Sequence, residues 1–100
     1  MPNFHTGKIQ PKDQDAVSVG TSSTQVIPDN YVRAGLVLTN ISENFVFLSL
    51  NGTAAVLYKG ITLNPRGGVW EMTDYTFVNG VIYAIATGAD STLTIQEFTA

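Results

Sequence analysis

The chain consists of short apolar runs, each ended by turn-forming residues, and this division constrains the fold more than any other feature. Val17 and Val19 alternate with Ser18 in the first run. Turn residues such as Pro28-Asp29-Asn30 separate the runs. The later runs cover residues 24–27, 35–41, 45–50, 61–63, 69–72, 80–87 and 92–98. Short strands spaced by roughly 8 to 12 residues, with no long amphipathic helix between them, are typical of a β-sandwich or a barrel.

The composition agrees with a single all-β domain. Of the 100 residues, 44% are hydrophobic and only 13% are charged, whereas about a quarter of an average soluble chain is charged. We therefore predict an all-β fold over residues 15–100, an antiparallel two-sheet β-sandwich for which a jelly roll is one fitting topology. Residues 1–14 show neither a strand nor a helix period, so they are predicted to form an extended N-terminal arm.

Two pairs of neighbouring runs are predicted to form hairpins because the connections between them are short. Residues 35–41 are expected to pair with residues 45–50, and residues 80–87 with residues 92–98, at the end of the chain. Residues 53–60 contain several helix-forming residues, but a segment this short is marginal as a helix. We expect a loop or a partial strand there.

Two of the runs are apolar on both faces. In residues 45–50, Phe45 and Phe47 alternate with Val46, Leu48 and Leu50, and residues 81–86 repeat the pattern. A two-layer sandwich has one inner face per sheet, so either a loop of the same chain or a neighbouring copy must cover the second face. We expect a neighbouring copy. This predicts a homo-oligomer with Phe45, Phe47 and Tyr83 in the subunit interface.

The arm combines apolar anchors with positive charge. Lys8 and Lys12 give residues 1–14 a net charge of +1, whereas the rest of the chain carries −4. Phe4 and Ile9 are the large apolar side chains of the arm. Such an arm either stays disordered or becomes ordered on a neighbouring protein. If it docks, Phe4, Lys8, Ile9 and Lys12 are the predicted docking residues.

No group of residues predicts catalysis, a metal or a cofactor. The chain has no cysteine and one histidine, His5, in the arm, so it lacks the residues of thiolate, zinc and histidine-assisted nucleophilic sites. Glu71 and Asp74 are expected to be solvated carboxylates rather than an acid-base pair. The acidic body would repel nucleic acid, and no apolar stretch reaches the length of a membrane-spanning helix. We expect a non-enzymatic protein that binds neither nucleic acid nor membrane.

Aromatic residues near turns are the remaining candidates for a ligand site. Trp70, Tyr75 and Tyr58 lie near turns, where aromatic rings can stack on sugars or anchor an interface. Trp70, Asp74 and Tyr75 are the residues that would form a ligand platform. The alternative is that Trp70 packs in the core, in which case no platform forms.

Three segments of the chain resemble small virion-associated proteins of tailed bacteriophages. The segments are Ser22 to Pro28, Arg33 to Ser42 and Ile61 to Gly68. In that family, a segment of the form R-x-G-L-x-L-x-N-x-S is followed by a short I-x-L-x-P-G-G turn and a C-terminal strand pair. Here Arg66 separates Pro65 from the two glycines, so no binding residue is carried over from the family.

The resemblance implies a capsid decoration or cement protein that binds the major capsid protein and stabilises the phage head. Such proteins are commonly β-rich trimers that grip the shell with an N-terminal arm. It also implies synthesis in the cytoplasm of a bacterial host and a final place on the capsid surface of the virion. The alternative is a carbohydrate- or receptor-binding module of a phage tail or fibre.

Overall fold

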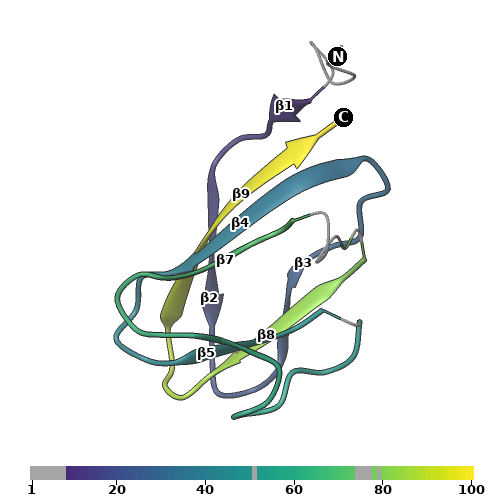
Figure 1. Cartoon of the computed structure of the whole chain (residues 1–100). Helices are drawn as coiled ribbons and strands as arrows, with labels where there is room; N and C mark the ends of the chain where they lie inside the picture. Colours follow the sequence, from purple (N-terminus) through teal and green to yellow (C-terminus); the bar gives the residue numbers. More distant parts are fainter. Residues whose placement is uncertain (1–8, 51, 74–77, 79) are drawn as a thin grey trace.

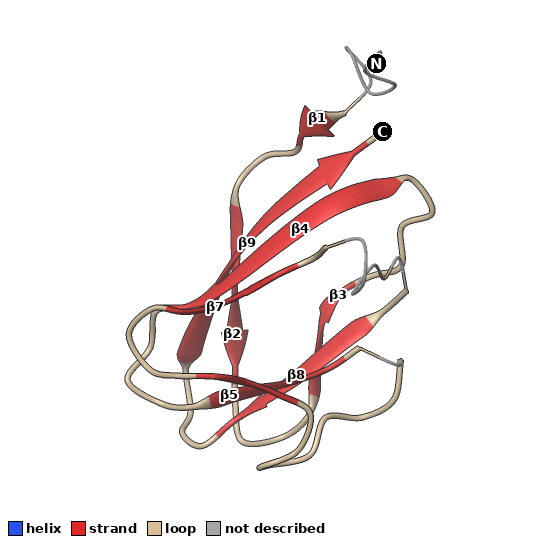
Figure 2. Ribbon diagram, viewed as in Figure 1, coloured by secondary structure: helices blue, strands red, loops and turns tan. Residues whose placement is uncertain are grey.

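A computed structural model of the chain describes residues 9–50, 52–73, 78 and 80–100. These residues form strands and loops and contain no helix (Figure 2). The strands are β1 (Gln10–Pro11), β2 (Asp15–Val19), β3 (Thr24–Ile27), β4 (Arg33–Asn40), β5 (Val46–Ser49), β6 (Ile61–Leu63), β7 (Gly68–Glu71), β8 (Ile82–Ala86) and β9 (Ser91–Thr99). The all-β prediction is confirmed, and the runs 24–27 and 61–63 form strands with the predicted bounds.

The strands form two antiparallel sheets that pack face to face (Figure 1). Sheet A has the order β2-β9-β4-β7, and β1 extends it along the far end of β9. Sheet B has the order β3-β8-β5-β6. Along the chain, β5 and β6 are neighbours within one sheet, whereas the other connections from β2 to β9 cross between the sheets. This order is that of a jelly roll, one of the topologies that fit the sequence.

Both predicted hairpins are wrong. Strand β4 pairs with β7 and β9 in sheet A, whereas β5 pairs with β6 and β8 in sheet B. Likewise β8 and β9 belong to different sheets. A short polar connection fits a hairpin and a crossing between two packed sheets equally well, so its length did not distinguish the two.

The core lies between the sheets and is formed by alternate residues of each strand. In β9, Leu93 and Ile95 are buried while Thr94 and Gln96 are half-buried on the other face, as the alternation of the sequence predicts. Trp70 on β7 is 8% exposed and belongs to the same apolar cluster. The core alternative for Trp70 is therefore confirmed, and Trp70 cannot serve as an exposed stacking platform.

The outer face of sheet B is covered by the chain itself. The loop of residues 52–60 brings Ala55 and Leu57 against Phe47 and Ile85, with Tyr83 packed against the same cluster. Residues 53–60 form a loop, as expected. Phe47, predicted to lie in a subunit interface, is only 2% exposed beneath that loop. It has no surface left to offer a second copy, so the assignment of Phe47 is corrected.

The described part of the arm is extended and attached to β9. Gln10 and Pro11 are opposite Thr99 and Phe98, and the Lys12 amide donates to the Glu97 carbonyl at 2.8 Å. Residues 10–12 thus continue the edge of sheet A. Phe4 and Lys8 lie outside the described residues.

Candidate functional site

One end of the molecule is organised by a buried arginine at the start of β4. The Arg33 side chain is fully buried, and its Nε donates to Glu97 Oε2 of β9 at 2.6 Å. Its remaining nitrogens donate to the carbonyls of Pro28, Val78 and Gly80. One side chain therefore connects the loop before β4, the segment before β8 and the end of β9. We call Arg33 and Glu97, with these partners, the charged hub.

The carboxylate of the charged hub is held in its ionised form. Asn30 donates to Glu97 Oε2 at 3.1 Å, and Lys12 Nζ lies 3.4 Å from Oε1. Burial acts to raise the pKa of Glu97, but hydrogen bonds from Arg33 and Asn30, with the charges of Arg33 and Lys12, outweigh it. The pKa of Glu97 is therefore below its usual range. Lys12, predicted as a docking residue, is engaged with its own chain, although its side chain remains 54% exposed.

Exposed apolar side chains lie beside the charged hub. Tyr31 is 85% exposed and Val32 is 54% exposed, both in the turn before β4. The Ala100 amide donates to the Val32 carbonyl, which places the C-terminus next to this turn. Figure 1 shows β1 and the C-terminus at the same end. We call this end, formed by β1, Tyr31, Val32 and Ala100, the arm end.

The opposite end of β4 carries a second buried hub, which is neutral. The Asn40 side chain is inaccessible, and its amide nitrogen lies 2.7 to 3.1 Å from the carbonyls of Asn44, Leu63 and Asn64. Its amide oxygen accepts from the backbone and hydroxyl of Ser42. Asn40 thereby ties the β4–β5 loop to the β6–β7 loop. We call Asn40 with these partners the neutral hub.

The two outer faces of the sandwich differ. Sheet B is covered by residues 52–60, but the described chain leaves the outer face of sheet A open. Strand alternation places Val37, Thr39 and Val69 on that face, and Val69 is 55% exposed. A shallow hollow of about 340 Å³ there is lined by Gln14, Asp15, Val37, Thr39, Thr94, Ile95 and Gln96.

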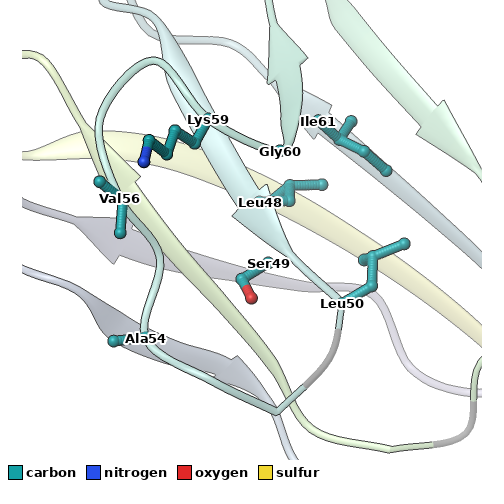
Figure 3. A pocket seen from close by; sticks show the side chains of 8 residues that line it. All are labelled: Leu48, Ser49, Leu50, Ala54, Val56, Lys59, Gly60 and Ile61. Atoms are coloured by element: carbon teal, nitrogen blue, oxygen red, sulfur yellow. The ribbon is translucent and has the colours of Figure 1, made fainter.

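A smaller groove lies where the loop of residues 52–60 returns to β6. It has a volume of about 220 Å³ and is lined by Leu48, Ser49, Leu50, Ala54, Val56, Lys59, Gly60 and Ile61 (Figure 3). Most of its walls are aliphatic, and the Lys59 side chain lies at its rim. Sequence reasoning missed this groove, because its walls come from two strands and a loop whose path the sequence does not predict.

The predicted site residues are therefore dispersed. Trp70 is in the core, and Asp74 and Tyr75 lie outside the described residues. Phe45 is 42% exposed and stacks beside Phe47, so it alone of that predicted pair reaches the surface. Tyr83 is half-buried beneath the loop of sheet B, and Ile9 is half-buried at the root of the arm.

Within the described ranges there is no cluster of three or more His, Cys, Asp or Glu side chains that could hold a metal ion. Nor do those ranges contain a helix with the length and apolar character needed to cross a bilayer. Comparison with protein-family models, with curated proteins and with solved structures found no match for this chain.

Proposed function

We propose that the chain is a non-enzymatic structural protein that attaches to a larger protein shell, as a capsid decoration protein of a tailed bacteriophage does. The observation that carries the proposal is the construction of the arm end. There β1 is fastened to β9 beside the exposed Tyr31 and Val32, and the charged hub fixes the strands behind them. An arm that is hydrogen-bonded to the edge of a sheet, next to exposed apolar groups, suits attachment to a neighbouring protein.

The jelly-roll order of the strands adds support at the level of fold alone. Jelly rolls occur in viral capsid proteins and in lectins, so the fold by itself does not choose between shell binding and sugar binding. The burial of Trp70 removes the central residue of the sugar platform predicted from the sequence. Shell binding is therefore the function we propose.

A homotrimer belongs to the same proposal. Because residues 52–60 cover Phe47, self-association would use surfaces that remain open, namely Phe45 or the outer face of sheet A. Light scattering of the purified chain should give three times the mass of one chain. A monomer mass at micromolar concentration would refute the trimer without bearing on shell attachment.

The experiment that tests attachment uses phage particles that lack the chain, mixed with purified protein and sedimented. The full chain should co-sediment, and it should remain bound in about 1 M salt, where the Debye length is about 3 Å. Phe4→Ala with Ile9→Ala should weaken attachment more than Lys8→Ala with Lys12→Ala, because burial of large apolar side chains contributes more than exposed ion pairs.

Release by salt alone, with the apolar double variant still bound, would show that charge governs attachment. Failure of the full chain to bind the particles at all would overturn the proposal. Recovery of the chain on tails or fibres, with binding to glycans, would favour the receptor-binding alternative.

A further inference from the structure

The groove between the loop of residues 52–60 and the strands β5 and β6 has a size and a lining that suit a small apolar ligand. Its volume of about 220 Å³ exceeds the roughly 150 Å³ of an engineered apolar cavity that holds benzene. Leu50 and Ile61 form one side and Val56 the other, as Figure 3 shows. The groove can therefore accept a short hydrocarbon group.

The turn that carries Lys59 is built to hold it at the rim. The Lys59 amide donates to the Val56 carbonyl at 3.2 Å, which closes a turn over residues 56–59. Tyr58 and Gly60, on either side of Lys59, have φ of 65° and 79°. A left-handed backbone costs free energy at Tyr58, and such residues often occur at functional sites.

Gly60 fixes how closely this turn approaches β5. A Cβ at position 60 would lie 2.3 Å from the Leu48 carbonyl oxygen, so only glycine allows the approach that shapes the groove. The Tyr58 ring makes an edge contact with Phe47, with ring centroids 5.2 Å apart. The backbone on both sides of Lys59 is thus held in place.

Charge complementarity indicates the ligand. Among the described residues, Lys12, Arg33 and Arg66 each have a carboxylate within 4 Å, and Lys59 has none. Among the described residues of the groove wall, the only hydroxyl is that of Ser49, which is already hydrogen-bonded to Thr53 at 3.2 Å. The groove therefore presents aliphatic walls and one uncompensated positive charge at its rim.

We propose that this groove binds a medium-chain aliphatic carboxylate, with the hydrocarbon chain against Leu50, Val56 and Ile61 and the carboxylate at the Lys59 ammonium. The site is independent of the shell-binding function proposed above, since it lies on sheet B and its loop rather than at the arm end. A neutral alcohol of the same chain length should enter the groove more weakly, because it lacks the ion pair. An alkylamine should be disfavoured by like charge.

The test is a titration of the isotope-labelled full chain with octanoate, followed through backbone amide shifts. We expect saturable shifts confined to the groove, including Ser49, Gly60 and Ile61, with a dissociation constant on the order of a millimolar. Octanol should bind about two- to fivefold more weakly, the size of effect expected for an exposed ion pair. Acetate should give no saturable shifts, since it cannot fill the apolar walls.

Substitutions at Lys59 and Val56, both exposed, measure the contributions of charge and of apolar contact separately, and Arg66 provides the control. Lys59→Gln should abolish the preference for octanoate over octanol, whereas Arg66→Gln, beyond the other end of β6, should leave it unchanged. Val56→Ala should weaken octanoate and octanol by a similar factor, about threefold or more.

The proposal is overturned if octanoate gives no saturable shifts, if the shifts fall on another surface, or if octylamine binds as tightly as octanoate. An octanoate preference that persists in the Lys59→Gln variant would also overturn it. None of these outcomes bears on attachment to a shell, which is measured separately by sedimentation with particles.

Discussion

Strand β4 begins and ends with a buried polar side chain. Each of these side chains needs hydrogen-bond partners inside the protein, and the two ends of the strand supply them differently. At the first position, Arg33 carries a charge that is neutralised by Glu97 and shared among three backbone carbonyls. At the last position, Asn40 satisfies the connecting loops without any charge. Both residues have almost no exposed surface, at 2% and 0%.

The charge of one hub and the neutrality of the other correspond to different roles for the two ends of the sandwich. Burying an ion pair costs desolvation, and the pair repays that cost only when its geometry and hydrogen bonds are kept, so the charged hub favours the arrangement of strands in which they are formed. That arrangement lies behind the arm end, where we propose attachment. The neutral hub closes the far end of the sandwich, where the chain crosses between sheets, and its contribution should not depend on the ionisation of Glu97.

Breaking the charged hub should have the largest effect. Arg33→Met would leave the largely buried Glu97 carboxylate with only Asn30 and the half-exposed Lys12 as partners, and it would remove the Arg33 donor from three backbone carbonyls. We expect the free energy of unfolding to fall by about 3 to 5 kcal/mol, measured by urea denaturation. Arg66→Met is the matched control, because its ion pair with Glu43 is exposed on both sides and is worth at most about 1 kcal/mol. Equal losses in the two variants would contradict the special role of Arg33.

Breaking the neutral hub should cost less. Asn40→Ala removes one donor to each of the Asn44, Leu63 and Asn64 carbonyls, and it removes the acceptor of the Ser42 amide and hydroxyl. The Asn44 carbonyl keeps the Ser42 hydroxyl as a donor, and the Asn64 carbonyl keeps the Gly68 amide. We expect a loss of about 2 to 3 kcal/mol in the same denaturation experiment. Asn64→Ala, at an exposed neighbour whose carbonyl is retained, should change stability by less than about 0.5 kcal/mol. A loss from Asn40→Ala as small as that of the control would contradict the role of Asn40 in joining the two loops.

The smallest expected effect is a difference between the two hubs in how their contribution to stability depends on pH. Because the pKa of Glu97 is lowered in the folded protein, its ionisation stabilises the fold above the unfolded value of about 4.3. That contribution is lost as the pH falls through the folded pKa. The destabilisation by Arg33→Met should therefore shrink below about pH 4.3, while that by Asn40→Ala should stay constant. Denaturation curves at neutral and acid pH measure both differences, and a parallel response of the two variants would contradict the distinction.

The strands were predictable from the sequence because their signals are local. The run of residues 24–27 ends at Pro28, and the run 61–63 ends at Asn64-Pro65, so turn chemistry alone sets where each strand stops. The alternation of Leu93 and Ile95 with polar residues likewise predicts the buried face of β9. Local pattern is enough where a strand has one buried face.

The pairing of strands and both hubs were not predictable in this way. Arg33 and Glu97 are 64 residues apart in the chain, and only the register between β4 and β9 brings them together. The cover over Phe47 depends on the path of residues 52–60. The sequence predicted a loop there, but it did not predict the face of the sandwich against which the loop packs. The groove beside Lys59 follows from that same path, so it too lay beyond the reach of the sequence pattern.

Cryo-electron microscopy of phage particles that carry the chain would test the central claim most directly, at a resolution sufficient to trace β4 and β9. The account predicts density on the capsid surface in which the Arg33 end of β4, with β1 and Tyr31, faces the shell. The Asn40 end should then point toward solvent. Density with the Asn40 end against the shell would contradict the claim, as would particles whose capsids carry no copy of the chain.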